Sequence, residues 1–244
     1  MKNVLFLILS LVIFVGCKTD DEPIVEKWTS IATVENPSKN SVFYFRLDNN
    51  DRMKVQTTAF PYYIPKDGQR IIALYSILSV NNQNALYNHQ VGLYDYYEVL
   101  TKGIFNVKPS QQDSIGNDPI AINSIWIGSD YLNVDFAYYG NNQIHFINLV
   151  SDTSKTYTDG KIHLEFRHNA NDDAALYTRS GVSSFKLHDL KAGSTVDSIN
   201  LVIHTKEFVS PSDKTYNLTY KFGSLASQQK VPKVQLSKEL TRVK

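Results

Sequence analysis

The feature that most constrains the fold is a period-two alternation of apolar and polar residues in the second half of the chain. One run places apolar residues at every second position: Tyr216, Leu218, Tyr220 and Phe222. Successive side chains of a β-strand point to opposite faces, so this run predicts a strand with one buried face. The same alternation recurs in residues 131–139, 144–148, 161–168, 185–187 and 199–203. Because it is one-sided, it favours two sheets packed face to face over a parallel sheet that is buried on both sides.

With a further strand over 120–127, the second half contains about seven strands, the number expected of an antiparallel β-sandwich. The first half has shorter strand-like runs, namely 28–34, 42–47, 53–57, 70–80 and 89–94. About five strands in about eighty residues favour a small barrel over an α/β domain. Residues 95–102 are ambiguous and compatible with a short helix, and 103–107 are expected to close the barrel. The 15 Tyr and 12 Phe residues agree with an all-β fold, since aromatic side chains suit a pleated surface.

A polar, proline-containing segment over 108–119 marks the predicted boundary between two domains, because it has little apolar surface to bury. We therefore expect a barrel domain over 28–108 and a β-sandwich domain over 119–227. Residues 228–244 are polar and net basic, and we expect them to form a mobile tail.

The N-terminus has the pattern of a signal peptide over residues 1–16. A basic start precedes an apolar run over 4–15, which is shorter than the roughly 20 residues of a membrane span. Cys17, the only cysteine, follows directly, and the junction resembles the lipobox of bacterial lipoproteins, although Phe14 stands where leucine is usual. The resemblance implies cleavage before Cys17 and attachment of acyl chains to it. The alternative is a free or disulfide-forming cysteine, although a single cysteine supplies no intrachain disulfide.

Charged residues follow the cysteine within a predicted tether over 17–27. Lys18, Asp20, Asp21 and Glu22 resemble the acidic export signal of Bacteroidetes lipoproteins. The resemblance implies a lipid anchor in the outer membrane and exposure at the cell surface. The alternatives are a plain solvated tether and the periplasmic leaflet.

A series of short motifs runs in order along almost all of the mature chain. They are Asp67–Ile72, Tyr97–Lys102, Asn117–Ile120, Tyr138–Gly140, His145–Val150, Leu164–Asn169 and Ser180–Val182. Together they resemble the NigD-like lipoproteins of Bacteroidetes. The resemblance implies an N-terminal OB-type barrel followed by a C-terminal β-sandwich. It implies no catalytic or ligand-binding motif, and the family name refers to a bacteriocin locus. The stretch Tyr94–Tyr96 is more aromatic than the family pattern, so a ligand of the relatives need not transfer.

Motifs for catalysis or metal binding are missing from the sequence. The six histidines are scattered, without a His-Glu-x-x-His pair or cysteine ligands. The segment 169–173 begins like a calcium loop, but Ala174 and Ser180 stand where glycine and glutamate are needed. There is no Gly-x-Ser-x-Gly elbow and no phosphate-binding glycine loop. His163, Glu165 and Arg167 share a strand face that is predicted to meet solvent. We therefore predict no catalytic residue, metal or cofactor.

Two aromatic clusters are the candidate ligand-binding residues. Phe60, Tyr62 and Tyr63 lie in a proline-bounded loop, and Tyr94, Tyr96 and Tyr97 lie in the later part of the barrel. A tyrosine ring has a flat apolar face and a hydroxyl group, which suits a sugar. OB barrels bind oligosaccharides or oligonucleotides on one face and its adjoining loops. The alternative is that these rings fill the barrel core or a domain interface.

The predicted function is a non-catalytic envelope protein that binds a glycan or a peptide. The alternatives are a protein-interaction or bacteriocin-related protective subunit of an envelope complex, and an unrecognised hydrolase. Removal of residues 1–16 takes away Lys2, one of 25 basic residues, and leaves 24 basic and 24 acidic residues. This neutral charge argues against nucleic acid as a partner, because nucleic-acid binding calls for a basic face.

Ser114 is a candidate for O-glycosylation. Asp113-Ser114-Ile115 resembles the Asp-Ser/Thr-apolar acceptor of Bacteroidetes and falls in the predicted linker. Asp197-Ser198-Ile199 matches as well but leads into a predicted strand.

Overall fold

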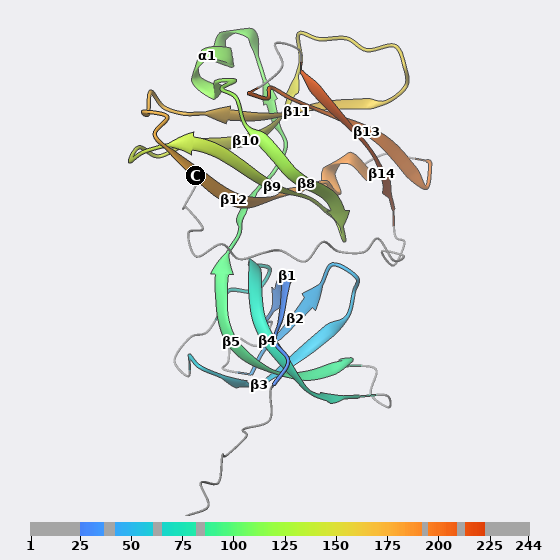
Figure 1. Ribbon diagram of the computed structural model, residues 1–244. Helices are drawn as coiled ribbons and strands as arrows, with labels where there is room; N and C mark the ends of the chain where they lie inside the picture. The colour runs from blue at the N-terminus through green and yellow to red at the C-terminus, as the bar shows by residue number, and fades with distance from the viewer. Residues whose placement is uncertain are drawn as a thin grey trace, which may run out of the picture.

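The computed structural model describes residues 25–36, 42–60, 65–81, 86–191, 195–208 and 213–222. It has a five-stranded closed barrel followed by a β-sandwich, which confirms the predicted fold class (Figure 1). Cys17, the acidic run after it, Tyr62, Tyr63 and the tail over 228–244 lie outside the described residues.

The barrel contains β1 (Trp28–Glu35), β2 (Tyr44–Leu47), β3 (Arg52–Thr58), β4 (Arg70–Val80) and β5 (His89–Glu98). Its strands follow the order β1-β2-β3-β5-β4, and β4 closes the barrel on β1. β3 and β5 run parallel, whereas the other neighbours are antiparallel. Alternate residues point inward, and Phe43, Phe45 and Val91 are among the buried side chains of the core.

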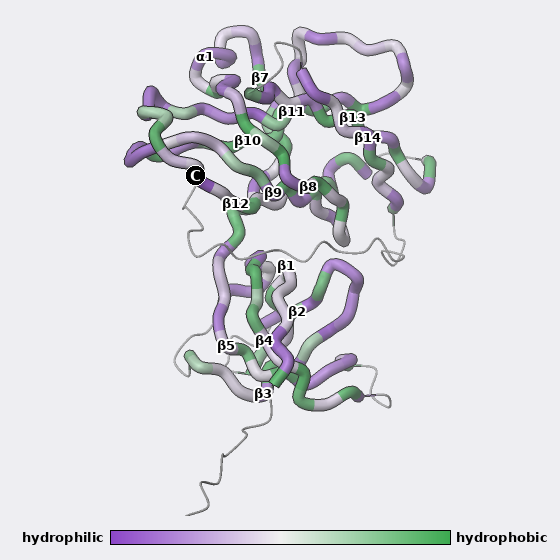
Figure 2. Tube along the Cα trace, viewed as in Figure 1, coloured by the Kyte–Doolittle hydropathy of each residue, from purple (hydrophilic) through white to green (hydrophobic). Residues whose placement is uncertain are grey.

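The sandwich contains β6 (Leu100–Lys102), β7 (Phe105–Val107), η1 (Pro109–Gln111), α1 (Gln112–Ile115), β8 (Ala121–Gly128), β9 (Tyr131–Gly140), β10 (Phe146–Asp152), β11 (Ile162–Asn169), β12 (Tyr177–Lys186), η2 (His188–Lys191), β13 (Ser198–Thr205) and β14 (Lys214–Lys221). One sheet has the order β6-β12-β9-β8, and the other has the order β14-β13-β11-β10-β7. Hydrophobic stretches occur in strands of both sheets (Figure 2). Phe136, Phe166 and Phe185 belong to the common core between the sheets.

The sheets of the sandwich are mixed, not purely antiparallel as predicted. β6 pairs parallel with β12, β7 with β10, and β11 with β13. Alternation reports which face of a strand is buried, but it carries no information about strand direction, so the parallel pairs could not be read from it.

The segment after β5 also differs from the prediction. Residues 95–98 continue β5 without a helix, and 105–107 do not close the barrel. β6 and β7 instead join the two sheets of the sandwich, one strand in each. The chain therefore leaves the barrel near Val99, earlier than the predicted boundary at 108–119, because the short runs 100–102 and 105–107 find partners only in the sandwich.

The barrel packs against the outer face of the β6-β12-β9-β8 sheet (Figure 1). Ile31, Ile72 and Val99 of the barrel side meet Trp126 and Val182 of the sheet in one buried apolar cluster. These side chains hold the two domains together as one packed unit, since apolar burial is the main favourable term in such interfaces.

A buried ion pair lies next to this apolar cluster. The Arg70 guanidinium donates to both Asp48 oxygens, at 2.7 and 3.1 Å, and to Asn133 Oδ1 at 2.9 Å. Asn133 in turn donates to Asp48 and accepts from the Ser184 hydroxyl. Arg70 also stacks over the Tyr131 ring at 4.4 Å. Arg70 also donates to Thr33 at 3.0 Å, so Thr33, Asp48 and Arg70 of the barrel share one hydrogen-bond network with Asn133 and Ser184 of the sandwich.

Candidate functional site

Of the aromatic residues predicted to bind a ligand, the structure describes Phe60, Tyr94, Tyr96 and Tyr97, and these four do not all share one side of the barrel wall. Phe60 and Tyr96 meet edge to face, with ring centroids 5.6 Å apart, and Tyr96 packs against the barrel core. For this pair the alternative interpretation, a packing role, fits better. The placement of Tyr62 and Tyr63 is not described.

Tyr94 and Tyr97 lie at the barrel surface. Tyr94 falls at a β-bulge, because Tyr75 pairs with Leu93 while Leu74 pairs with Asp95. Its ring carries the Lys27 ammonium at 4.5 Å, and its hydroxyl lies 3.2 Å from the Ser76 hydroxyl. Tyr97 is 40% exposed, and the negative charge of Asp95 raises the pKa of its phenol. The bulge therefore lies between Tyr94 and Tyr96, whereas Tyr97 and Tyr96 are adjacent in the strand and point to opposite sides of the barrel wall.

A second group, which the sequence argument missed, lies on the outer face of β2 and β3. Tyr44 and Arg46 alternate with the buried Phe45 and Leu47, and Arg52 and Lys54 alternate with the buried Met53 and Val55. The antiparallel register sets Tyr44 opposite Lys54 and Arg46 opposite Arg52. Residues opposite each other in a sheet have adjacent side chains on the same face. The two strands therefore present one tyrosine and three cations together.

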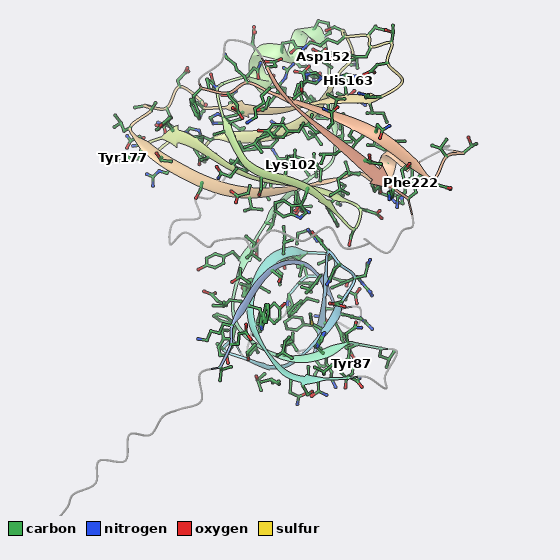
Figure 3. The ribbon with its side chains drawn as sticks, turned by 45° about the vertical axis from the view of Figure 1, so that its right-hand side comes forward. Tyr87, Lys102, Asp152, His163, Tyr177 and Phe222 are labelled. Atoms are coloured by element: carbon green, nitrogen blue, oxygen red, sulfur yellow. The ribbon has the colours of Figure 1, made fainter. Side chains whose placement is uncertain are left out.

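Tyr87 joins this group from the connection between β4 and β5 (Figure 3). Its ring centroid lies 6.4 Å from that of Tyr44, and Lys54 Nζ lies 5.4 Å from it. The Arg52 guanidinium lies 4.1 Å from the Tyr44 centroid, within the range of a cation–π contact. We call Tyr44, Arg46, Arg52, Lys54 and Tyr87 the basic–aromatic face.

The three cations of this face differ in the hydrogen bonds and ion pairs that they make with other residues of the chain. Arg52 is fixed, because Nε donates to Glu35 at 2.5 Å and Nη1 donates to the Leu86 carbonyl at 2.6 Å. Arg46 shares Glu35 through Nε at 2.6 Å and is 39% exposed at its side chain. Lys54 forms no ion pair with any residue that the structure describes, so its charge is open to a ligand. The alternation of basic residues with apolar ones in 44–47 and 52–55 was the available signal for this face.

The sandwich contains a buried carboxylate–imidazole–imidazole chain. His145 Nε2 donates to Asp173 at 3.0 Å, His145 Nδ1 lies 2.7 Å from His168 Nε2, and His168 Nδ1 donates to the Pro119 carbonyl at 3.1 Å. These three hydrogen bonds need three protons, but two neutral imidazoles carry only two. The Asp173–His145–His168 group therefore holds one proton more than an ionised carboxylate and two neutral imidazoles would supply.

Burial acts on the pKa of both ends of this hydrogen-bonded group, His168 and Asp173. Burial lowers the pKa of His168 to about 4, and the nearby His145 contributes in the same direction. His168 is thus held in its neutral form. Burial alone would raise the pKa of Asp173, but hydrogen bonds from the Asn141 amide and from His145 bring it well below its usual range. These hydrogen bonds link β11 to the segments that follow β9 and that precede β8 and β10.

The prediction that His163, Glu165 and Arg167 face solvent was wrong. Their side chains are only 9%, 9% and 5% exposed. α1 and the loop after β10 cover this face, which lies on the side of the sandwich away from the barrel (Figure 3). Gln112 of α1 accepts from Arg167, and Lys155 of the loop pairs with Glu165 at 2.7 Å. Alternation could not show that a connecting segment folds back over the sheet.

The covered face is also balanced in charge. Arg167 contacts Glu165 at 2.7 Å and Asp152 at 3.5 Å, and Lys155 pairs with the same two carboxylates. Two cations and two carboxylates therefore neutralise one another. Beside them, His163 stacks on Tyr157 with centroids 3.6 Å apart. Among the described residues, no group of three or more His, Cys, Asp or Glu side chains is arranged to hold a metal ion. In the same part of the chain, no helix is both long and apolar enough for a membrane span.

Ser114, the candidate glycosylation site, lies exposed on α1. Its hydroxyl donates to the Gln111 carbonyl at 2.9 Å.

Comparisons with known proteins agree with this architecture. The model of the NigD-like N-terminal OB domain matches residues 31–99, and that of the NigD-like C-terminal beta sandwich domain matches residues 103–222. A solved protein of unknown function from Bacteroides vulgatus is 31% identical, with a TM-score of 0.70 over 81% of this chain and 92% of that one. No curated protein matches the chain.

Two more distant structures share the fold. One is called a NigD-like immunity protein, from Bacteroides caccae, and is 17% identical with a TM-score of 0.59 over 82% of this chain and 98% of that one. The other is named as a lipoprotein, from Bacteroides fragilis, and is 13% identical with a TM-score of 0.55 over 82% of this chain and 100% of that one.

Proposed function

The chain belongs to the NigD-like family, and we propose that it is a lipid-anchored envelope protein whose barrel binds an oligosaccharide without changing it chemically. The observation that carries the proposal is the basic–aromatic face. It occupies β2 and β3 and adjoins the connection between β4 and β5. In OB barrels the corresponding strands and loops bind oligosaccharides and oligonucleotides.

Sugars fit this face better than nucleic acid does. Two tyrosine rings offer apolar faces for sugar rings and hydroxyls for hydrogen bonds. A mature chain with equal numbers of acidic and basic residues lacks the long-range attraction for a polyanion that nucleic-acid binding usually requires. The family models and the solved relative of unknown function carry no catalytic assignment, which is compatible with a binding role.

Binding of full-length protein to a panel of hexasaccharides, measured by isothermal titration calorimetry, tests this proposal. We expect Tyr44→Ala and Tyr87→Ala each to weaken binding about tenfold, since each removes an interaction of about 1.4 kcal/mol. Tyr97→Ala is the matched control, because it removes an exposed tyrosine of the same barrel outside the face. Failure of every hexasaccharide to bind, or equal loss in all three variants, would refute the proposal.

The second candidate function is contact with another envelope protein. It is favoured by a relative of the same fold that is called an immunity protein. A stoichiometric protein partner that co-purifies with the native chain but is lost from Tyr44→Ala would support this candidate. A catalytic role would instead require turnover that disappears with one carboxylate.

For the localisation, we propose acylation of Cys17 and exposure at the cell surface, because the N-terminal sequence resembles a lipoprotein signal followed by an acidic export signal. A solved structure with the same fold is named as a lipoprotein, which is compatible with an anchor. Protease treatment of intact cells tests this localisation. We expect the native protein to be digested and the Asp20→Ala/Asp21→Ala variant to be protected. Protection of both would place the protein in the periplasm.

We also propose that Ser114 carries an O-linked glycan in the native host, because its exposed position on α1 leaves it accessible. An intact mass without added hexoses would disprove this modification.

A further inference from the structure

We infer that the oligosaccharide bound by the basic–aromatic face is acidic, carrying carboxylate or sulfate groups. This inference rests on the proposed function and narrows its ligand class. Strands β1, β2 and β3 contain three cationic side chains, Arg46, Arg52 and Lys54, but a single carboxylate, Glu35. The face therefore has an excess of positive charge within a chain whose formal net charge is only +1.

The position of Glu35 makes this excess available to a ligand. Glu35 pairs opposite Tyr44 in the register of β1 and β2, and its two oxygens are divided between Arg46 and Arg52. One carboxylate thus serves two guanidinium groups through their Nε atoms. Arg46 keeps its terminal nitrogens free of other partners among the described residues, and an arginine fork of this kind matches the geometry of a carboxylate or sulfate.

Lys54 supplies the second anion contact. It has no ion-pair partner among the residues that the structure describes, and its ammonium lies beside the Tyr87 ring at 5.4 Å. A sugar ring stacked on Tyr87 would place an acidic substituent within reach of Lys54. Tyr87 is itself positioned by Gln90, whose Nε2 donates to the Tyr87 hydroxyl at 2.9 Å. The ring and the charge are therefore presented side by side.

Fixed parts of the face reduce the cost of ordering on binding. Arg52 is bound by Glu35 and by the Leu86 carbonyl, and its stacking on Tyr44 holds that ring. The Asn88 side chain also accepts from the Arg52 amide at 2.8 Å, so the connection that carries Tyr87 is tied to β3. A preformed platform with two free cationic ends favours a rigid, charged ring polymer over a flexible neutral one.

Hexagalacturonate and its fully methyl-esterified form make a matched pair of probes, because they share the same rings and differ in charge. We expect full-length protein in detergent to bind hexagalacturonate at least tenfold more tightly at low salt. The preference should shrink as salt rises from 20 to 300 mM, because screening weakens exposed charge contacts. Lys54→Gln and Arg46→Gln should each reduce hexagalacturonate binding several-fold and leave binding of the ester unchanged. Lys221→Gln, an exposed lysine on β14, is the matched control.

The outcomes separate the inference from the proposed function. Equal affinity for the acid and the ester would overturn the inference while the oligosaccharide proposal stands. Failure to bind any hexasaccharide would overturn both. Hexaglutamate serves as a third probe, and binding as tight as that of hexagalacturonate would overturn recognition of a sugar in favour of an acidic peptide. Thermal unfolding of each variant confirms that a lost affinity does not come from a lost fold.

Discussion

Replacement of Asp48 by alanine is expected to destabilise the joined domains strongly. The Arg70 and Asp48 side chains are 0% and 1% exposed, so solvent cannot replace the lost carboxylate. The variant would leave the guanidinium buried without its counter-charge and would remove an acceptor from the Asn133 amide. Removal of one partner of a buried ion pair costs about 3–5 kcal/mol. We therefore expect the free energy of unfolding to fall by about that amount.

Urea unfolding followed by tryptophan fluorescence measures this loss, since Trp126 lies in the same interface. The double variant Asp48→Leu/Arg70→Met provides the control, because replacing both charges by apolar groups leaves no unpaired ion. It should be much more stable than Asp48→Ala, and the two single changes should be strongly non-additive. A loss below about 1 kcal/mol in Asp48→Ala, or simple additivity in the cycle, would show that the pair does not hold the domains as argued.

Three further predictions concern the sandwich. The pKa of folded His168 is about 4, below the usual value of 6.5, so the unfolded protein binds more protons between these pH values. The free energy of unfolding should therefore fall by about 3 kcal/mol as pH falls from 6.5 to 4. Unfolding measured at stepped pH should show this slope, and His168→Gln should flatten it. Gly181→Ala would set a Cβ 2.8 Å from the Phe136 ring and should lower the free energy of unfolding by about 1–3 kcal/mol. Thermal unfolding can measure this loss against Ser180→Ala. An unchanged transition temperature would contradict the close packing. Lys102→Met should cost about 1–3 kcal/mol by leaving the Ile147 carbonyl without its donor, whereas Lys186→Met, on an exposed position, should be neutral in the same assay.

How much the sequence can predict depends on whether a feature is local. Alternation located most strands, because each buried face is recorded in the strand itself. It did not record that β6 and β7 leave the barrel for the sandwich, since pairing partners lie far away along the chain. It also could not show that α1 covers Glu165 and Arg167.

The candidate site illustrates the same limit. The density of aromatic residues along the sequence pointed to Tyr94, Tyr96 and Tyr97. In the structure a bulge lies between Tyr94 and Tyr96, and Tyr96 packs against the barrel core, so the three rings do not lie together. No local sequence pattern links Tyr44 and Tyr87, because they lie far apart along the chain. They meet only because β3 and β5 are neighbours in the barrel and the connection before β5 approaches β2.

The position of the barrel in the molecule also selects this face over the others. The outer side of β1 and of the first part of β4 is buried against the sandwich through Ile31 and Ile72, whereas the last four residues of β4 are exposed. On β5, the Tyr94 ring is partly used by Lys27, which immediately precedes β1 on the side of the chain that leads to the predicted anchor. The outer side of β2 and β3 has neither restriction. Its half-exposed residues are not part of the apolar contact with the sandwich, and Lys54, which has no ion-pair partner among the described residues, lies there beside the Tyr87 ring. A ligand that bound over Ile31 and Ile72 would have to displace the sandwich, and one that bound over the Tyr94 ring would have to displace Lys27.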